Sequence, residues 1–279
     1  MASRRRGLIV AVLACALVGV VQPAALARHR HRALVHHALE HASSSGRVVD
    51  DHASTSGRVV DSSNWSGYVE TAPAASRITS VTGHWIVPSA GTLPPGMSAT
   101  WAGIGGFGTS DLIQAGTTTN SVGAGQYYAW YELLPDGETP IAGCTRDAAC
   151  TINPGDSVAV HIDALGPTNW RIQIDDQGHW SWSTSVFYAS SESSAEWVLE
   201  VPSVVVGPTV LANVGAVTFD DGNGYRLGNL TKRISQDAPI LVRLNLFGVL
   251  PASLPSALDA DGDGFRACAY SARCAAPRS

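Results

Sequence analysis

Two short segments contain residue types that could together hydrolyse an amide bond. They are Leu112-Ile113-Gln114-Ala115-Gly116 and Ala195-Glu196-Trp197-Val198-Leu199-Glu200. A glutamate carboxylate can take a proton from water and later return it to a leaving group. A glutamine carboxamide does not titrate, and it can donate a hydrogen bond to a developing oxyanion. Such a pair could act through an activated water, so no metal, cofactor or covalent intermediate is expected.

Six motifs follow one another in the order and approximate spacing of a known family. They are Ser63-Asn64-Trp65-Ser66-Gly67, Thr100-Trp101-Ala102-Gly103-Ile104-Gly105, the Gln114 segment, Ala129-Trp130-Tyr131-Glu132, Pro154-Gly155-Asp156-Ser157-Val158 and the Glu200 segment. With these motifs the chain resembles the glutamic peptidases, the eqolisin family, as a bacterial-type member. The resemblance extends over roughly residues 62 to 250. It implies an endopeptidase that acts on protein or peptide substrates at acidic pH.

The resemblance also implies roles for five residues. The family's catalytic glutamate closes the second segment, which makes it Glu200 here, and its catalytic glutamine corresponds to Gln114. Trp65 and Trp101 match tryptophans that flank the active site, so both are expected to bind substrate. Glu132 either joins the polar network of the substrate groove or is a simple surface acid.

Alternation along the predicted strand separates the two glutamates of the second segment from its apolar residues. Trp197, Leu199 and Val201 share one face, which is expected to be core, so Glu196 and Glu200 face solvent or a groove. Periodicity alone does not choose between the two glutamates. The family motif favours Glu200 and leaves Glu196 as a solvated strand residue.

Two positions depart from the family pattern. Fungal members commonly have aspartate where this chain has Gly105, and they tend to have aspartate where it has Tyr128. The expected dyad is unaffected. The polarity of the substrate pocket, and hence its preferred side chains, cannot be transferred from the family.

The elements that must position these residues are predicted to be short β-strands. Apolar and polar residues alternate with period two, and Gly, Pro, Asn and Asp separate the runs. We expect strands at 84–87, 98–104, 127–133, 158–163, 170–174, 180–182, 196–201, 216–219, 240–246 and 265–270, with a hairpin turn at Asp175-Asp176-Gln177-Gly178. This pattern indicates an all-β sandwich or barrel. The family resemblance narrows it to a β-sandwich of two large antiparallel sheets, of concanavalin-like or jelly-roll architecture, with a concave substrate groove.

The first 27 residues have the composition of a signal peptide. Arg4-Arg5-Arg6 precede an apolar run over 7–21, and Ala25-Leu26-Ala27 offers small residues for cleavage after Ala27. The run is shorter than the roughly 20 residues that span a bilayer. A lipoprotein box at Val12-Leu13-Ala14-Cys15 fits poorly, so a secreted, extracellular protein is expected, with no membrane attachment after signal removal.

Residues 28–61 differ in composition from residues 62–279, the expected peptidase domain. They contain six of the nine histidines and the near-repeat of Ser43–Asp50 at Ser54–Asp61. Composition favours a disordered linker, whereas the family resemblance favours a removable propeptide that inhibits the enzyme.

From Ser62 onward there are ten basic and nineteen acidic residues, a formal charge of −9. That charge would attract the cationic segment, and it disfavours nucleic acid as a partner. The domain is expected to be a monomer.

Four cysteines remain after signal removal, which suggests two disulfides with three possible connectivities. Cys144–Cys150 and Cys268–Cys274 are favoured because each closes a short loop.

An acidic stretch, Asp259-Ala260-Asp261-Gly262-Asp263-Gly264, resembles the start of a calcium loop, but Tyr270 stands where the loop needs glutamate. A tight acidic turn is the favoured interpretation, with weak calcium binding as the alternative. Motifs of aspartic, serine and zinc peptidases do not occur in the sequence. A carbohydrate-binding or glycan-cleaving β-sandwich, with Glu132 or Glu196 beside Glu200 as its second carboxylate, is the rival function.

Overall fold

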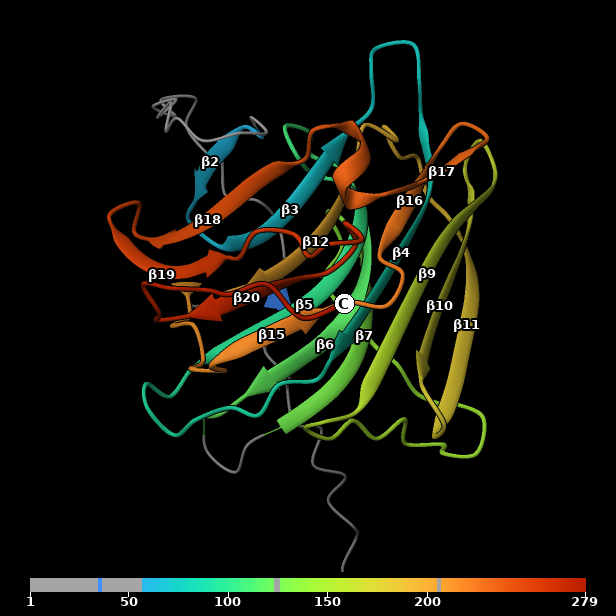
Figure 1. Ribbon diagram of the computed structural model, residues 1–279. Coiled ribbons are helices and arrows are strands. Elements are labelled where there is room, and N and C mark those ends of the chain that lie inside the picture. Colours follow the sequence, from blue (N-terminus) through green and yellow to red (C-terminus); the bar gives the residue numbers. More distant parts are fainter. Residues whose placement is uncertain (1–34, 37–56, 123–125, 205–206) are drawn as a thin grey trace, which may run out of the picture. The chain divides into compact units, whose positions relative to one another are not determined.

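The computed structural model describes residues 35–36, 57–122, 126–204 and 207–279 (Figure 1). The predicted signal peptide, 1–27, and most of the predicted propeptide, 28–61, lie outside these residues. The chain divides into the units Met1–Arg32 and Ala33–Ser279, and all described residues belong to the second. Among them, no helix is long and apolar enough to cross a membrane.

Nearly all regular structure in the described residues is β-strand, as the alternating pattern predicts. The single helical turn is the 3-10 helix η1 (Ile234–Asp237). The strands are β1 (Val35–His36), β2 (Val59–Ser62), β3 (Trp65–Thr71), β4 (Ile78–Ile86), β5 (Met97–Gly105), β6 (Leu112–Asn120), β7 (Gln126–Leu133), β8 (Thr139–Pro140), β9 (Ser157–Gly166), β10 (Asn169–Asp176), β11 (Trp180–Phe187), β12 (Ser194–Glu200), β13 (Ser203–Val204), β14 (Gly207–Pro208), β15 (Ala216–Phe219), β16 (Gly224–Leu227), β17 (Leu230–Arg233), β18 (Ile240–Leu246), β19 (Leu250–Pro255) and β20 (Phe265–Ala269).

Most strands pair into one continuous hydrogen-bonded series. It runs β8–β7–β6–β5–β12–β3–β18–β19–β20–β15–β4–β9–β10–β11, with β16 and β17 attached at β4 and β2 attached at β18. Figure 1 shows β5, β6 and β7 as long strands side by side. Every pairing in the series is antiparallel except β2–β18, which is parallel. The all-β, antiparallel prediction is confirmed.

Each expected strand overlaps an observed one, but β4 begins six residues before the expected 84–87 and β11 continues five residues beyond the expected 180–182. The predicted turn at Asp175–Gly178 is wrong in its first half, because β10 continues through Asp176 and pairs with β11 there. Asp176 stays in the strand because its side chain is buried and accepts a hydrogen bond from the His179 side chain. Both predicted disulfides, Cys144–Cys150 and Cys268–Cys274, are confirmed.

Two apolar clusters pack on opposite faces of the strands around β12. Ala195, Trp197 and Leu199 belong to the larger cluster, which also contains β4, β9 and β10 residues. Val198 belongs to a smaller cluster together with Trp65 and Trp101. Because residues alternate between faces, Glu196 and Glu200 lie on the side of the smaller cluster. Apolar packing on both faces therefore holds β12 in place.

The predicted domain boundary between residues 61 and 62 falls inside β2. Val59, Val60, Asp61 and Ser62 pair with residues 241–244 of β18. Asp61 also forms an ion pair with Arg243, with Oδ1 and Nε 2.9 Å apart. Residues 59–61 therefore belong structurally to the sheet that follows them.

Candidate active site

Strand register places all five predicted site residues on one face of the sheet. Directly paired residues in antiparallel strands project to the same side. Glu196, Gly103, Gln114 and Glu132 form one such row across β12, β5, β6 and β7. A second row lies two residues further along each strand and contains Val198, Trp101, Gly116 and Trp130. A third row lies two residues beyond the second and contains Trp65, Glu200, Ala99, Thr118 and Tyr128. The sheet thus gathers residues that are far apart in sequence.

Glu200 is fully buried and is held by one donor from β5 and one from the loop between β2 and β3. Trp101 Nε1 donates to its Oε2 at 2.7 Å, and Asn64 Nδ2 donates to its Oε1 at 3.2 Å. Trp65 packs edge-on against Trp101, with ring centroids 5.0 Å apart. An ionised carboxylate only accepts hydrogen bonds, so both contacts suit a group that must act as a base.

Asn64 is a residue whose role the sequence reasoning missed. Its Oδ1 accepts a hydrogen bond from the Ser62 hydroxyl, which orients its Nδ2 toward Glu200. The Trp65 amide donates to the same hydroxyl oxygen. Asn64 belongs to the motif Ser63-Asn64-Trp65-Ser66-Gly67, which the sequence shows. The sequence does not show that Asn64 contacts Glu200, which lies 136 residues away.

Gln114 is fully buried and donates from Nε2 to Glu132 Oε2 at 2.7 Å. Its Oε1 accepts no hydrogen bond from the described residues. Since a carboxamide has two N–H donors, one remains beyond the Glu132 contact. Glu132 is also fully buried, so the interpretation of Glu132 as a surface acid is wrong, and it accepts a hydrogen bond from Gln114.

Glu196 is not solvated, contrary to the expectation for this position. It is fully buried, and only Gly103, which has no side chain, lies between it and Gln114 in their row. Burial raises the pKa of Glu196 well above its usual value, and the nearby Asp111 carboxylate acts in the same direction. Burial therefore favours the neutral form of Glu196.

Asp111 occupies space beside one of the positions that departs from the family pattern. Gly105 has φ +86°, and a Cβ added there would lie 2.7 Å from Asp111 Oδ2. That oxygen accepts hydrogen bonds from the Ser191 amide and the Ser190 hydroxyl. Burial opposes ionisation of Asp111, but hydrogen bonds from Ser191 and Thr109 lower its pKa. The Asp111 carboxylate therefore lies next to position 105, although residue 105 is a glycine without a side chain.

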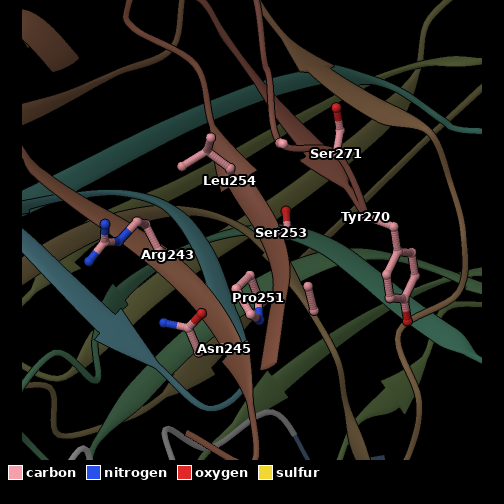
Figure 2. Close-up of a pocket in the computed structure, with 9 residues that line it drawn as sticks. Arg243, Asn245, Pro251, Ser253, Leu254, Tyr270 and Ser271 are labelled. Carbon is pink, nitrogen blue, oxygen red and sulfur yellow. The ribbon is translucent and has the colours of Figure 1, made fainter. Parts of the chain in front are cut away.

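Figure 2 shows a pocket of about 650 Å³ that lies elsewhere on the sheet. Residues of β18 and β19 and of the segment after β20 line it, among them Arg243, Asn245 and Tyr270. It contains none of the five predicted site residues, so its chemistry is separate from theirs.

Comparisons with known proteins identify the family and the fold. The Peptidase A4 family profile matches residues 63–238. Among solved structures, scytalido-glutamic peptidase with a transition-state analogue inhibitor is 20% identical with a TM-score of 0.59, covering 74% of this chain and 98% of that one. SCP-B, an eqolisin in complex with the tripeptide Ala-Ile-His, is 19% identical with a TM-score of 0.55 and the same coverage. Aspergilloglutamic peptidase from Aspergillus niger is 22% identical with a TM-score of 0.53, covering 62% and 98%. At these identities the likeness establishes the fold. No curated protein matches the chain significantly.

Proposed function

Because this chain belongs to the peptidase A4 family of glutamic peptidases, we propose that it is a secreted, acid-acting endopeptidase whose catalytic dyad is Glu200 and Gln114. The observation that carries the assignment is the common face on which both residues are buried and held by neighbours, Glu200 by Trp101 and Asn64 and Gln114 by Glu132. Trp65 and Trp101 are proposed to line the substrate site on that face.

In the proposed reaction, the Glu200 carboxylate removes a proton from the attacking water. The resulting hydroxide attacks the scissile carbonyl, and the free N–H of Gln114 donates to the tetrahedral oxyanion. Glu200 then returns the proton to the leaving nitrogen, which breaks the carbon–nitrogen bond. Glu132 supports both steps because its hydrogen bond keeps the carboxamide oriented.

Acidic operation follows from the ordinary chemistry of the groups involved. An isolated glutamate titrates near pH 4.3, so it exchanges protons readily in both directions at acidic pH. The domain's acidic residues lose charge in the same range, which limits repulsion between them. Two disulfides suit an oxidising, extracellular compartment.

We propose that the strands form a β-sandwich of two large antiparallel sheets, that the site face is its concave substrate groove, and that the segment before β2 covers the groove in the precursor. Val60 of β2 supports the second point, because it packs against the apolar cluster that contains Trp65 and Trp101. Phe107 and Tyr128 pack against the same cluster. Gly105 and Tyr128, in place of the aspartates common in fungal members, support a bacterial-type member with its own pocket polarity.

The dyad is tested by Glu200→Gln and Gln114→Ala, with Glu196→Gln as the matched control. Each dyad variant should fold yet lose turnover of denatured protein at acidic pH, by about 10²–10³-fold for loss of the Gln114 donor. Glu196→Gln should be much milder, because it replaces a buried neutral acid with a neutral amide. Full activity of Glu200→Gln, or an equal loss at Glu196, would overturn the assignment. Turnover of polysaccharides instead of protein would favour the rival glycan-cleaving function.

A further inference from the structure

Three aspartates meet where β15 and β20 end side by side. Phe219, the last residue of β15, pairs with Phe265, the first of β20. The register therefore places Asp220 beside Gly264, at the end of the acidic stretch 259–264. Carboxylate oxygens of Asp220, Asp259 and Asp263 lie within 4.8 Å of one another. The sheet pairing, and not the loop alone, brings the third carboxylate to this cluster.

Two of these aspartates have buried oxygens with no hydrogen-bond partner among the described residues. Asp263 is 5% exposed, and its Oδ1 is unpaired. Asp259 Oδ1 accepts hydrogen bonds from the amides of Gly262 and Gly264, at 3.0 and 3.1 Å, while its Oδ2 is buried and unpaired. A buried carboxylate oxygen without a donor is costly. Two such oxygens on neighbouring aspartates are suited to binding a cation.

Gly264 leaves the space in which the carboxylates converge. A Cβ at this position would lie 2.3 Å from Asp259 Oδ2 and 2.7 Å from Asp220 Oδ1. Any side chain would therefore collide with two of the three carboxylates. The chain has a glycine where a bound ion would need room.

The cluster is short of positive charge. Asp221 and Asp261 add further negative charge beside it, and Arg233 Nε is 3.8 Å from Asp263 Oδ2. One arginine at this distance does not balance three converging carboxylates, whereas a divalent cation would.

We propose that Asp220, Asp259 and Asp263 form a calcium-binding site that fastens the acidic loop to the end of β15. Calcium takes oxygen ligands at 2.3–2.6 Å, so two calcium–oxygen bonds span about 4.8 Å. All three side chains offer hard oxygen ligands, which suits calcium better than zinc. The tight acidic turn expected from the sequence is thus also a ligand loop, and the site is independent of the proposed dyad.

The test uses the full secreted protein, stripped with a chelator and followed by thermal unfolding and calorimetric titration at about pH 7. Calcium should bind at one ion per chain, with a dissociation constant on the order of 10⁻⁴–10⁻³ M, as in other extracellular sites. About 5 mM calcium should then raise the unfolding temperature by about 3–6 °C. Magnesium at the same concentration should raise it much less, because it prefers shorter bonds and keeps its waters.

Asp263→Asn and Asp220→Asn should each weaken calcium binding at least tenfold. Neither should lower the unfolding temperature of the calcium-free protein, since each removes a repelling charge. Asp176→Asn is the matched control, because Asp176 is equally buried in the other acidic cluster, beside Asp156 and His179. It should keep the calcium response. The proposal is overturned if calcium leaves the wild-type unfolding temperature unchanged, or if Asp263→Asn and Asp220→Asn respond as the wild type does.

Discussion

Glu70 and Glu196 lie on neighbouring strands but on opposite faces of the sheet, and burial acts on both. Burial, with the nearby Asp237 carboxylate, raises the pKa of Glu70 to about 8, although the Asp237 amide and Lys232 oppose the shift. The folded state thus holds this proton more tightly than the unfolded state does. Its contribution to stability is complete below about pH 4.5 and is lost as pH rises through about 8. Both buried acids therefore favour the folded state under acidic conditions.

Glu70→Gln tests this pH dependence of stability directly. The variant should match the wild type in thermal unfolding near pH 4 and exceed it near pH 9, by about 10 °C or more, because the amide never ionises. Activity should persist, since Glu70 faces away from the site residues. Asp136→Asn, at an exposed acid, should show no such crossover. A Glu70→Gln protein that is less stable than the wild type at pH 9 would contradict the argument.

The sequence motifs were sufficient to nominate Gln114 and Glu200, but they did not reveal the side chains that hold them. Asn64 reaches Glu200 across 136 residues, and Asp111 becomes relevant only because the chain turns at Gly105. Both contacts depend on tertiary structure, which local patterns do not contain. The prediction that Glu196 is solvated was wrong for a related reason. Alternation shows which face of the strand carries Glu196, but it does not show that a second apolar cluster covers that face.

β10 was predictable from alternation, whereas β6 was not. β10 alternates between buried and half-exposed residues, whereas eight of the nine residues of β6 are buried. β6 also contains a run of threonines, so it shows neither alternation nor a continuous apolar stretch. This is the strand that carries Gln114, and only the family motif pointed to it.

β2 provides a prediction at the scale of one element. A chain that begins at Ser62 lacks Val59, Val60 and the Asp61–Arg243 ion pair, which a chain beginning at Gly57 keeps. We expect the shorter chain to unfold at a lower temperature, by about 3–8 °C, because three paired residues are lost from the edge of β18. The comparison requires only thermal unfolding of the two purified proteins. Equal unfolding temperatures would show that β2 adds nothing to the sheet.

At the scale of the whole molecule, charge separates the two parts of the chain. Residues 28–61 contain six histidines and five arginines, while the domain from Ser62 has a formal charge of −9. Acidification first charges the histidines, near pH 6.5, and only later discharges the carboxylates, near pH 4. The first step strengthens attraction between the two parts and the second weakens it. An inhibitory segment should therefore be released in the carboxylate range.

The purified precursor should accordingly remain intact and inactive near pH 6 and should process itself between about pH 5 and pH 3. Peptidase activity and autocleavage, followed together from pH 7 downward, measure this. The chain beginning at Gly57 is the control and should be active without a lag. Activation completed by pH 6, or a precursor as active as the control, would reduce the segment to a linker.

The parallel pairing of β2 with β18 also sets an order of events during synthesis. Asp61 and Arg243 are 182 residues apart, and a ribosome adding about 5–20 residues per second needs roughly 10–40 s to make that stretch. Through this interval Val59 and Val60 have no β18 to pair with. The β2–β18 ladder therefore forms late, and the nascent chain carries an unpaired apolar edge for most of its time on the ribosome.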